Sequence, residues 1–126
     1  MPSLVFKGFS GSLPTSVFEY VEDGQKIGLL QVRHQPSAGK DVPQDMASHM
    51  YYEIEPAYRG KGHGKRLFGL GLEEARKVGL TEVIATCDAD NVISKHIIES
   101  WGGVFEKELM NPATGKPLLK YRIALA

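Results

Sequence analysis

The chain has 126 residues, of which 42% are hydrophobic, and its 15 basic and 15 acidic side chains give a formal net charge of zero. This length fits a single domain, residues 1–126, whose core needs no disulfide or metal. The neutral balance argues against a nucleic-acid binder that relies on overall charge, and the single cysteine, Cys87, excludes an intramolecular disulfide. No apolar run approaches the roughly 20 residues of a membrane span, and the N-terminus has no signal-peptide pattern. We therefore expect a soluble, cytoplasmic protein that binds neither nucleic acid nor membranes.

Alternating apolar residues and turn signals predict strands, and apolar residues at three- and four-residue steps predict helices. The expected strands are residues 4–9, 16–22, 26–34, 48–55, 82–87, 104–109 and 118–124. One helix is expected to end before Gly79, and a second to cover residues 92–101. Residues 35–47 are rich in turn formers and are expected to form a loop. The order β-β-β-β-α-β-α-β-β indicates an α/β or α+β domain with a mixed sheet.

The stretch from Pro56 to Arg66 leaves a strand and enters a helix, and its composition is unusual for that position. It carries cations and glycines with no acid among them: Arg59, Lys61, Lys65, Arg66, Gly60, Gly62 and Gly64. A helix N-terminus has unpaired N–H groups and a partial positive charge, so cations there are normally unfavourable. Glycines and cations together indicate a cradle for an anion, most simply a phosphate, and a solvated basic turn is the alternative. The glycine spacing fits neither a Walker A loop nor a dinucleotide fingerprint.

The same stretch contains the pattern Arg/Gln-x-x-Gly-x-Gly/Ala, met by Arg59, Gly62 and Gly64 after a strand that stops before Pro56. Further along, Asn91 is followed by Ser94 and, after eleven residues, by Gly102. With these motifs in this order, residues 17–125 resemble the GNAT superfamily of N-acetyltransferases. The resemblance implies a mixed, mostly antiparallel twisted sheet with two main helices, in a short form without the usual N-terminal helices.

The resemblance also implies acetyl-CoA as co-substrate. Backbone N–H groups of the loop would hold its pyrophosphate, the preceding strand would pair with the pantetheine arm, and Asn91 would hydrogen-bond that arm with Ser94 close beside it. The cofactor-binding residues implied in this way are Tyr52, Ile54, Arg59, Gly60, Lys61, Gly62, His63, Gly64, Lys65, Asn91 and Ser94. The histidines have no metal-ligand spacing, so no metal site is predicted.

Acetyl transfer to an amine requires a proton acceptor, because a lysine-like amine, with a pKa of about 10.4, is almost fully protonated at neutral pH. Glu53 and Glu55 are the candidates for this base, and strand alternation places both on one face, opposite Ile54. A backbone N–H near Ile54 would meet the developing oxyanion. Many family members carry a proton-donating tyrosine at the position of Ile98, so the general acid has no predicted occupant.

The expected function is N-acetyltransfer from acetyl-CoA to a primary amine, on a small molecule or a peptide, directly in a ternary complex. The alternative is a non-catalytic acyl-CoA-binding or regulatory module of the same fold, which Ile98 and the short N-terminal part favour. Family members usually have a strand and two helices before the hairpin, whereas about fifteen residues precede Ser16 here. The acceptor site is then open, lined by residues 35–47, or completed by a second copy of the chain. Because a second copy could complete the site, we expect a homodimer slightly more than a monomer.

Overall fold

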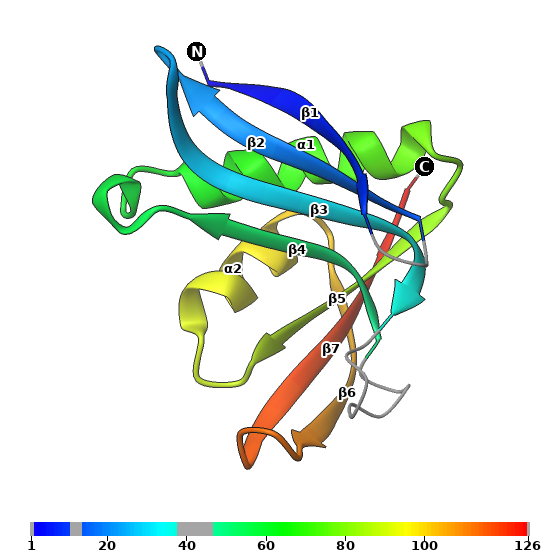
Figure 1. The fold of residues 1–126 in the computed structure, drawn as a ribbon. Helices are drawn as coiled ribbons and strands as arrows, with labels where there is room; N and C mark the ends of the chain where they lie inside the picture. Colours follow the sequence, from blue (N-terminus) through cyan, green and yellow to red (C-terminus); the bar gives the residue numbers. More distant parts are fainter. Residues whose placement is uncertain (1, 11–13, 38–46, 126) are drawn as a thin grey trace.

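The computed structural model describes residues 2–10, 14–37 and 47–125 (Figure 1). The elements follow the predicted order: β1 (Ser3–Ser10), β2 (Thr15–Glu22), β3 (Gln25–Ser37), β4 (Ser48–Ile54), a 3₁₀ turn (Pro56–Tyr58), α1 (His63–Lys77), β5 (Glu82–Asp88), α2 (Val92–Ser100), β6 (Val104–Asn111) and β7 (Lys116–Ala124). β1 pairs directly with β2, and in the described residues no helix stands between them. Neither helix in this part of the chain is long and apolar enough to span a bilayer.

The strands form two antiparallel sheets, one with the order β1-β2-β3-β4 and one with the order β5-β7-β6. Figure 1 shows that β4 and β5 lie close at their beginnings and diverge toward their carboxyl ends. α1 packs against β3 and β4, α2 packs against β5, and the two helices touch each other. The predicted α+β architecture is therefore confirmed, with the strands divided between two sheets that meet at β4 and β5.

The third strand is longer than predicted, which corrects the start of the expected loop. β3 continues to Ser37, which pairs with Ser48, although Gln35 and Pro36 were expected in the loop. The register shifts between Val32 and Ser37, so Pro36, which has no backbone N–H, falls where the ladder is irregular. Of the remaining loop residues, 38–46 lie outside the described residues, and Ala47 precedes β4 without strand structure.

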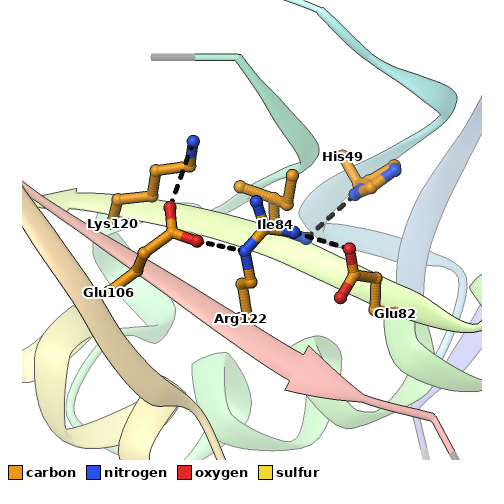
Figure 2. A network of polar contacts seen from close by, with 6 residues as sticks. All are labelled: His49, Glu82, Ile84, Glu106, Lys120 and Arg122. Atoms are coloured by element: carbon orange, nitrogen blue, oxygen red, sulfur yellow. Dashed lines mark hydrogen bonds and ion pairs between the residues drawn. The ribbon is translucent and has the colours of Figure 1, made fainter. Parts of the chain in front are cut away.

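A side chain joins the two sheets where β4 and β5 lie close. His49 on β4 is only 4% exposed, and its Nδ1 accepts a hydrogen bond from the backbone N–H of Ile84 on β5, at 2.9 Å (Figure 2). Burial lowers the pKa of His49, and Arg122 and Arg33 lower it further against an opposing effect of Glu82. The imidazole is therefore held neutral, as an accepting Nδ1 requires.

We expect this histidine to make folding stability depend on pH. Because its pKa is lower in the folded chain than in the unfolded chain, the unfolded chain binds more protons below about pH 6.5. The free energy of unfolding should therefore fall as the pH decreases below that value. In His49→Asn, whose side-chain oxygen can accept the same bond without titrating, the fall should be smaller. Urea unfolding at a series of pH values measures how the free energy of unfolding changes with pH in wild type and in His49→Asn. An equal change in both would contradict the role given to His49.

An ionic network lies beside this contact and joins the three strands of the second sheet (Figure 2). Arg122 on β7 donates to Glu82 of β5 at 2.6 Å and to Glu106 of β6. Lys120 is nearly buried, and its ammonium lies 3.3 Å from the Glu106 carboxylate. A buried ammonium is costly without such a partner, so the network stabilises the polar side chains of β7 between β5 and β6.

Packing between α1 and α2 depends on a glycine. A Cβ at Gly69 would lie 2.6 Å from Cη2 of Trp101, whose ring is held in place because its Nε1 donates to the carbonyl of Lys65 at 2.8 Å. We expect Gly69→Ala to lower the free energy of unfolding by about 2 kcal/mol, because the indole must move and lose that bond. Gly71→Ala is the matched control, since the nearest obstacle there is the flexible end of Met50 at 2.5 Å. Thermal unfolding of both variants checks the difference, and equal stabilities would contradict the packing argument.

Candidate functional site

A cleft of about 700 Å³ lies between the end of β4, the loop after it, the first turn of α1 and the N-terminal half of α2. In Figure 1 this region is found where β4 and β5 have diverged, beside α2. The lining residues are Tyr52, Glu53, Ile54, Tyr58, Arg59, Gly60, Gly62, His63, Gly64, Lys65, Asn91, Val92, Ile93, Ser94, His96 and Ile97. The cleft therefore brings together residues from two separate sequence motifs.

The glycines of the loop allow its backbone to turn into α1. Gly60 and Gly62 have φ of +80° and +83°, in the left-handed region that glycine adopts at little cost. Gly62 is the N-cap of α1, where no side chain caps the helix and no acid lies in the first turn. A Cβ at Gly64 would lie 3.2 Å from Cδ1 of Ile97, so this glycine also lets α1 approach α2. The helix N-terminus thus presents N–H groups without a side-chain acceptor, as an anion-binding loop requires.

The cations of the loop differ in their contacts. Arg59 folds back along β4, where its Nε donates to the carbonyl of Ile54 at 2.8 Å and a terminal nitrogen lies 3.9 Å from the carboxylate of Glu53. Lys65 lines the cleft, whereas Lys61 does not and lies over the ring of Tyr58, 6.0 Å from its centre. All the residues predicted to bind the cofactor line the cleft except Lys61.

The first turn of α2 forms the opposite wall. Asn91 is the N-cap of this helix, and its side-chain oxygen accepts from the backbone N–H of Ser94 at 3.1 Å. Val92 and Ile93 are 70% and 75% exposed although both line the cleft. The prediction missed these two residues, and also Tyr58 in the loop after β4 and His96 and Ile97 on α2. For the residues of α2, the available signal was the spacing of Val92 from His96 and of Ile93 from Ile97, since residues four apart share one face of a helix.

The two candidate carboxylates occupy different positions. Glu53 lines the cleft, has a half-exposed side chain and accepts a hydrogen bond from the hydroxyl of Tyr51 at 3.0 Å. That bond is the main reason why the pKa of Tyr51 is raised. Glu55 follows the strand and is not among the lining residues, although its backbone N–H still bonds to the carbonyl of Ile27 at 2.9 Å. Of the two, only Glu53 can act within the cleft as it stands.

The backbone of Ile54 faces the open side of β4. Glu55 donates its N–H to β3, and donor direction alternates along an antiparallel strand, so the N–H of Ile54 points away from β3. β4 is the last strand of its sheet, which leaves this edge without a paired strand in the described structure. The edge can therefore bond an extended ligand, and its N–H groups can meet a carbonyl oxygen.

The sequence matches the acetyltransferase (GNAT) family over residues 5–102, a range that contains the glycine loop, the open edge of β4 and α2. The chain belongs to the GNAT acetyltransferase family. The predicted family and the fold it implies are thereby confirmed. A comparison with curated protein sequences gave no match.

Solved structures share this GNAT fold. The yncA protein of Salmonella typhimurium, in complex with its cofactor acetyl-CoA, is 20% identical, has a TM-score of 0.69 and matches 89% of this chain with 65% of its own. A spermidine N-acetyltransferase SpeG chimera from Vibrio cholerae and hSSAT is 17% identical, with a TM-score of 0.69 and coverages of 87% and 66%. The NatC complex bound to Gag peptide and CoA gives 15% identity, a TM-score of 0.68 and coverages of 87% and 71%. This GNAT chain thus spans about two thirds of the length of the structures it matches.

Proposed function

We propose that residues 1–126 form one acetyl-CoA-dependent N-acetyltransferase domain that acetylates a primary amine by direct transfer in a ternary complex. The observation that carries this proposal is the cleft, in which an uncapped helix N-terminus and an unpaired strand edge meet beside a carboxylate. Family membership supports the same conclusion. The structures matched include proteins named for spermidine acetylation and for binding a peptide, which supports a small-molecule or peptide amine as acceptor.

The two walls of the cleft fit the two parts of the cofactor. The backbone N–H groups from Gly60 to Gly64 would hold the pyrophosphate, and Lys65 would supply positive charge beside it. The Arg59 side chain turns instead toward Ile54 and Glu53 on β4. The edge of β4 from Tyr52 to Ile54, where the carbonyl of Ile54 already accepts from Nε of Arg59, would pair with the pantetheine amides, which leaves the thioester near Glu53. The exposed apolar side chains of Val92 and Ile93 would cover the arm from α2.

Glu53 is assigned as the base. It would accept the amine proton through a water molecule as nitrogen attacks the thioester carbonyl, and the N–H of Ile54 would stabilise the oxyanion. The hydroxyl of Tyr51 holds this carboxylate at the edge of the cleft. Arg59, 3.9 Å away and exposed, contributes little to holding Glu53 in place.

A non-catalytic acyl-CoA-binding or regulatory module is the second candidate function. Ile98, at the position of the family's usual proton donor, is 1% exposed and does not line the cleft. No helix lies between β1 and β2 in the described chain, so a partner, such as a second copy of this chain, would have to take the place of the family's usual N-terminal helices.

Calorimetric titration with acetyl-CoA, with ATP and NAD as controls, tests the cleft, and a thiol-release assay with spermidine and short peptides tests turnover. Selective micromolar binding with amine-dependent release of CoA supports the enzyme. Selective binding without release across a broad amine panel would favour the binding module. Failure to bind acetyl-CoA would overturn both.

A further inference from the structure

A phenol occupies the cleft where the two sequence motifs meet. Tyr52 projects from β4, and its hydroxyl donates to Oγ of Ser94 on α2 at 3.4 Å, with both residues in the lining. Its ring packs edge-on against Phe68, with 5.4 Å between ring centres, so Phe68 holds the ring and Ser94 holds the hydroxyl. The hydroxyl thus lies between the strand edge and the helix, the two walls that would enclose the thioester.

Acetyl transfer from CoA releases a thiolate. An alkyl thiol has a pKa of about 8.5, and a thiolate formed in a cleft partly closed to water is less stable than one in solvent. A proton donor at the sulfur therefore lowers the barrier to C–S cleavage. Ile98 offers no proton, and the hydroxyl of Tyr58 is engaged with Gln25 at 2.6 Å.

The other proton donors of the lining are less well placed. His63 and Lys65 belong to the first turn of α1, where the phosphates would bind, and His96 is exposed on α2. Tyr52 is the donor that comes from the strand edge next to Ile54 and Glu53, the residues assigned to the reacting carbonyl and the base.

We propose that Tyr52 is the general acid of the reaction, with Ser94 as the residue that orients its hydroxyl. The inference rests on the proposed acetyltransferase function. The amine nitrogen forms a bond to the carbonyl carbon, its proton passes through water to Glu53, and the C–S bond breaks as the sulfur takes the proton of Tyr52. The phenolate then regains a proton from water by way of the Ser94 hydroxyl, and Glu53 releases its proton to solvent. One amide and one thiol result from one amine and one thioester.

The surroundings keep the phenol protonated before the reaction. Burial raises the pKa of Tyr52 above its usual value near 10, and the bond to Ser94 offsets only part of this effect. At neutral pH the hydroxyl is therefore protonated and available to donate as the C–S bond breaks.

The test compares Tyr52→Phe with Tyr121→Phe. Tyr121→Phe also removes a phenolic hydroxyl, which donates to the carboxylate of Glu99 at 2.8 Å, but Tyr121 does not line the cleft. We expect Tyr52→Phe to lower kcat for acetyl-CoA by about 100-fold with its Kd within threefold of wild type, and Tyr121→Phe to keep both values. Thermal unfolding of both variants verifies that they fold.

A second donor distinguishes proton transfer from a structural defect. The acetyl thioester of a nitrothiophenol releases a thiolate that needs no acid, so Tyr52→Phe should retain most of the wild-type rate with it. Equal kcat values for Tyr52→Phe and wild type with acetyl-CoA, or an equal loss with both donors, would overturn the role of Tyr52. If wild type itself transfers no acetyl group, the proposed function fails instead.

Discussion

Replacing Gly62 by aspartate is expected to weaken acetyl-CoA binding at least about 100-fold, close to 2.7 kcal/mol. Gly62 is the N-cap of α1, and an aspartate there would place its carboxylate on the N–H groups proposed to hold the pyrophosphate. The substitution therefore adds a negative charge next to the phosphates. Calorimetric titration of the variant with acetyl-CoA measures the loss.

Two controls separate charge from backbone strain. Gly62 has φ of +83° with no atom within 4 Å of an added Cβ, so the substitution costs strain but meets no obstacle. Gly62→Asn has the same size and tolerates this conformation equally well, so it should lose much less affinity. Gly79→Asp, at φ of +91° beyond the other end of α1, should bind acetyl-CoA like wild type. If Gly62→Asp keeps wild-type affinity, the loop does not hold the pyrophosphate.

The fold was predictable where local signals and tertiary structure agree. The Asp23-Gly24 pair takes positive φ values of 52° and 77°, as expected for the turn between β2 and β3. The end of β3 was missed because Pro36 is an ordinary loop signal, and only pairing with β4 keeps Ser37 in the sheet. The junction between the two sheets includes a hydrogen bond between His49 and Ile84, which are 35 residues apart, and no local pattern reports it.

The candidate site was predictable to the extent that it is built from backbone. The glycines and cations after β4 predict an anion-binding loop because the composition alone shows that Cβ atoms are missing and that basic residues are in excess there. The α2 wall was missed because Val92 and Ile93 are apolar yet exposed, which in isolation is common on protein surfaces. The meeting of Tyr52 with Ser94 joins residues 42 positions apart, so the structure was needed to bring a proton donor into the cleft.

The assignment of the base leads to the second large effect. Glu53→Gln is expected to lower kcat by about 100-fold at neutral pH while leaving the affinity for acetyl-CoA unchanged, because the amide keeps the shape of the side chain but accepts no proton. The deficit should shrink as the pH approaches about 10, where a lysine-like amine deprotonates without help. Rates of CoA release from pH 7 to 10, at saturating acetyl-CoA, measure this convergence.

Glu55→Gln gives the necessary comparison, because it removes the neighbouring carboxylate on the same face of the chain but outside the lining of the cleft. We expect its kcat to stay within about twofold of wild type, since a group that does not reach the amine contributes nothing to proton transfer. If Glu55→Gln shows the larger loss, the base lies at the end of the strand rather than in the cleft. If both variants follow the wild-type pH profile, the amine is deprotonated before it binds, and binding of the neutral amine would limit the rate.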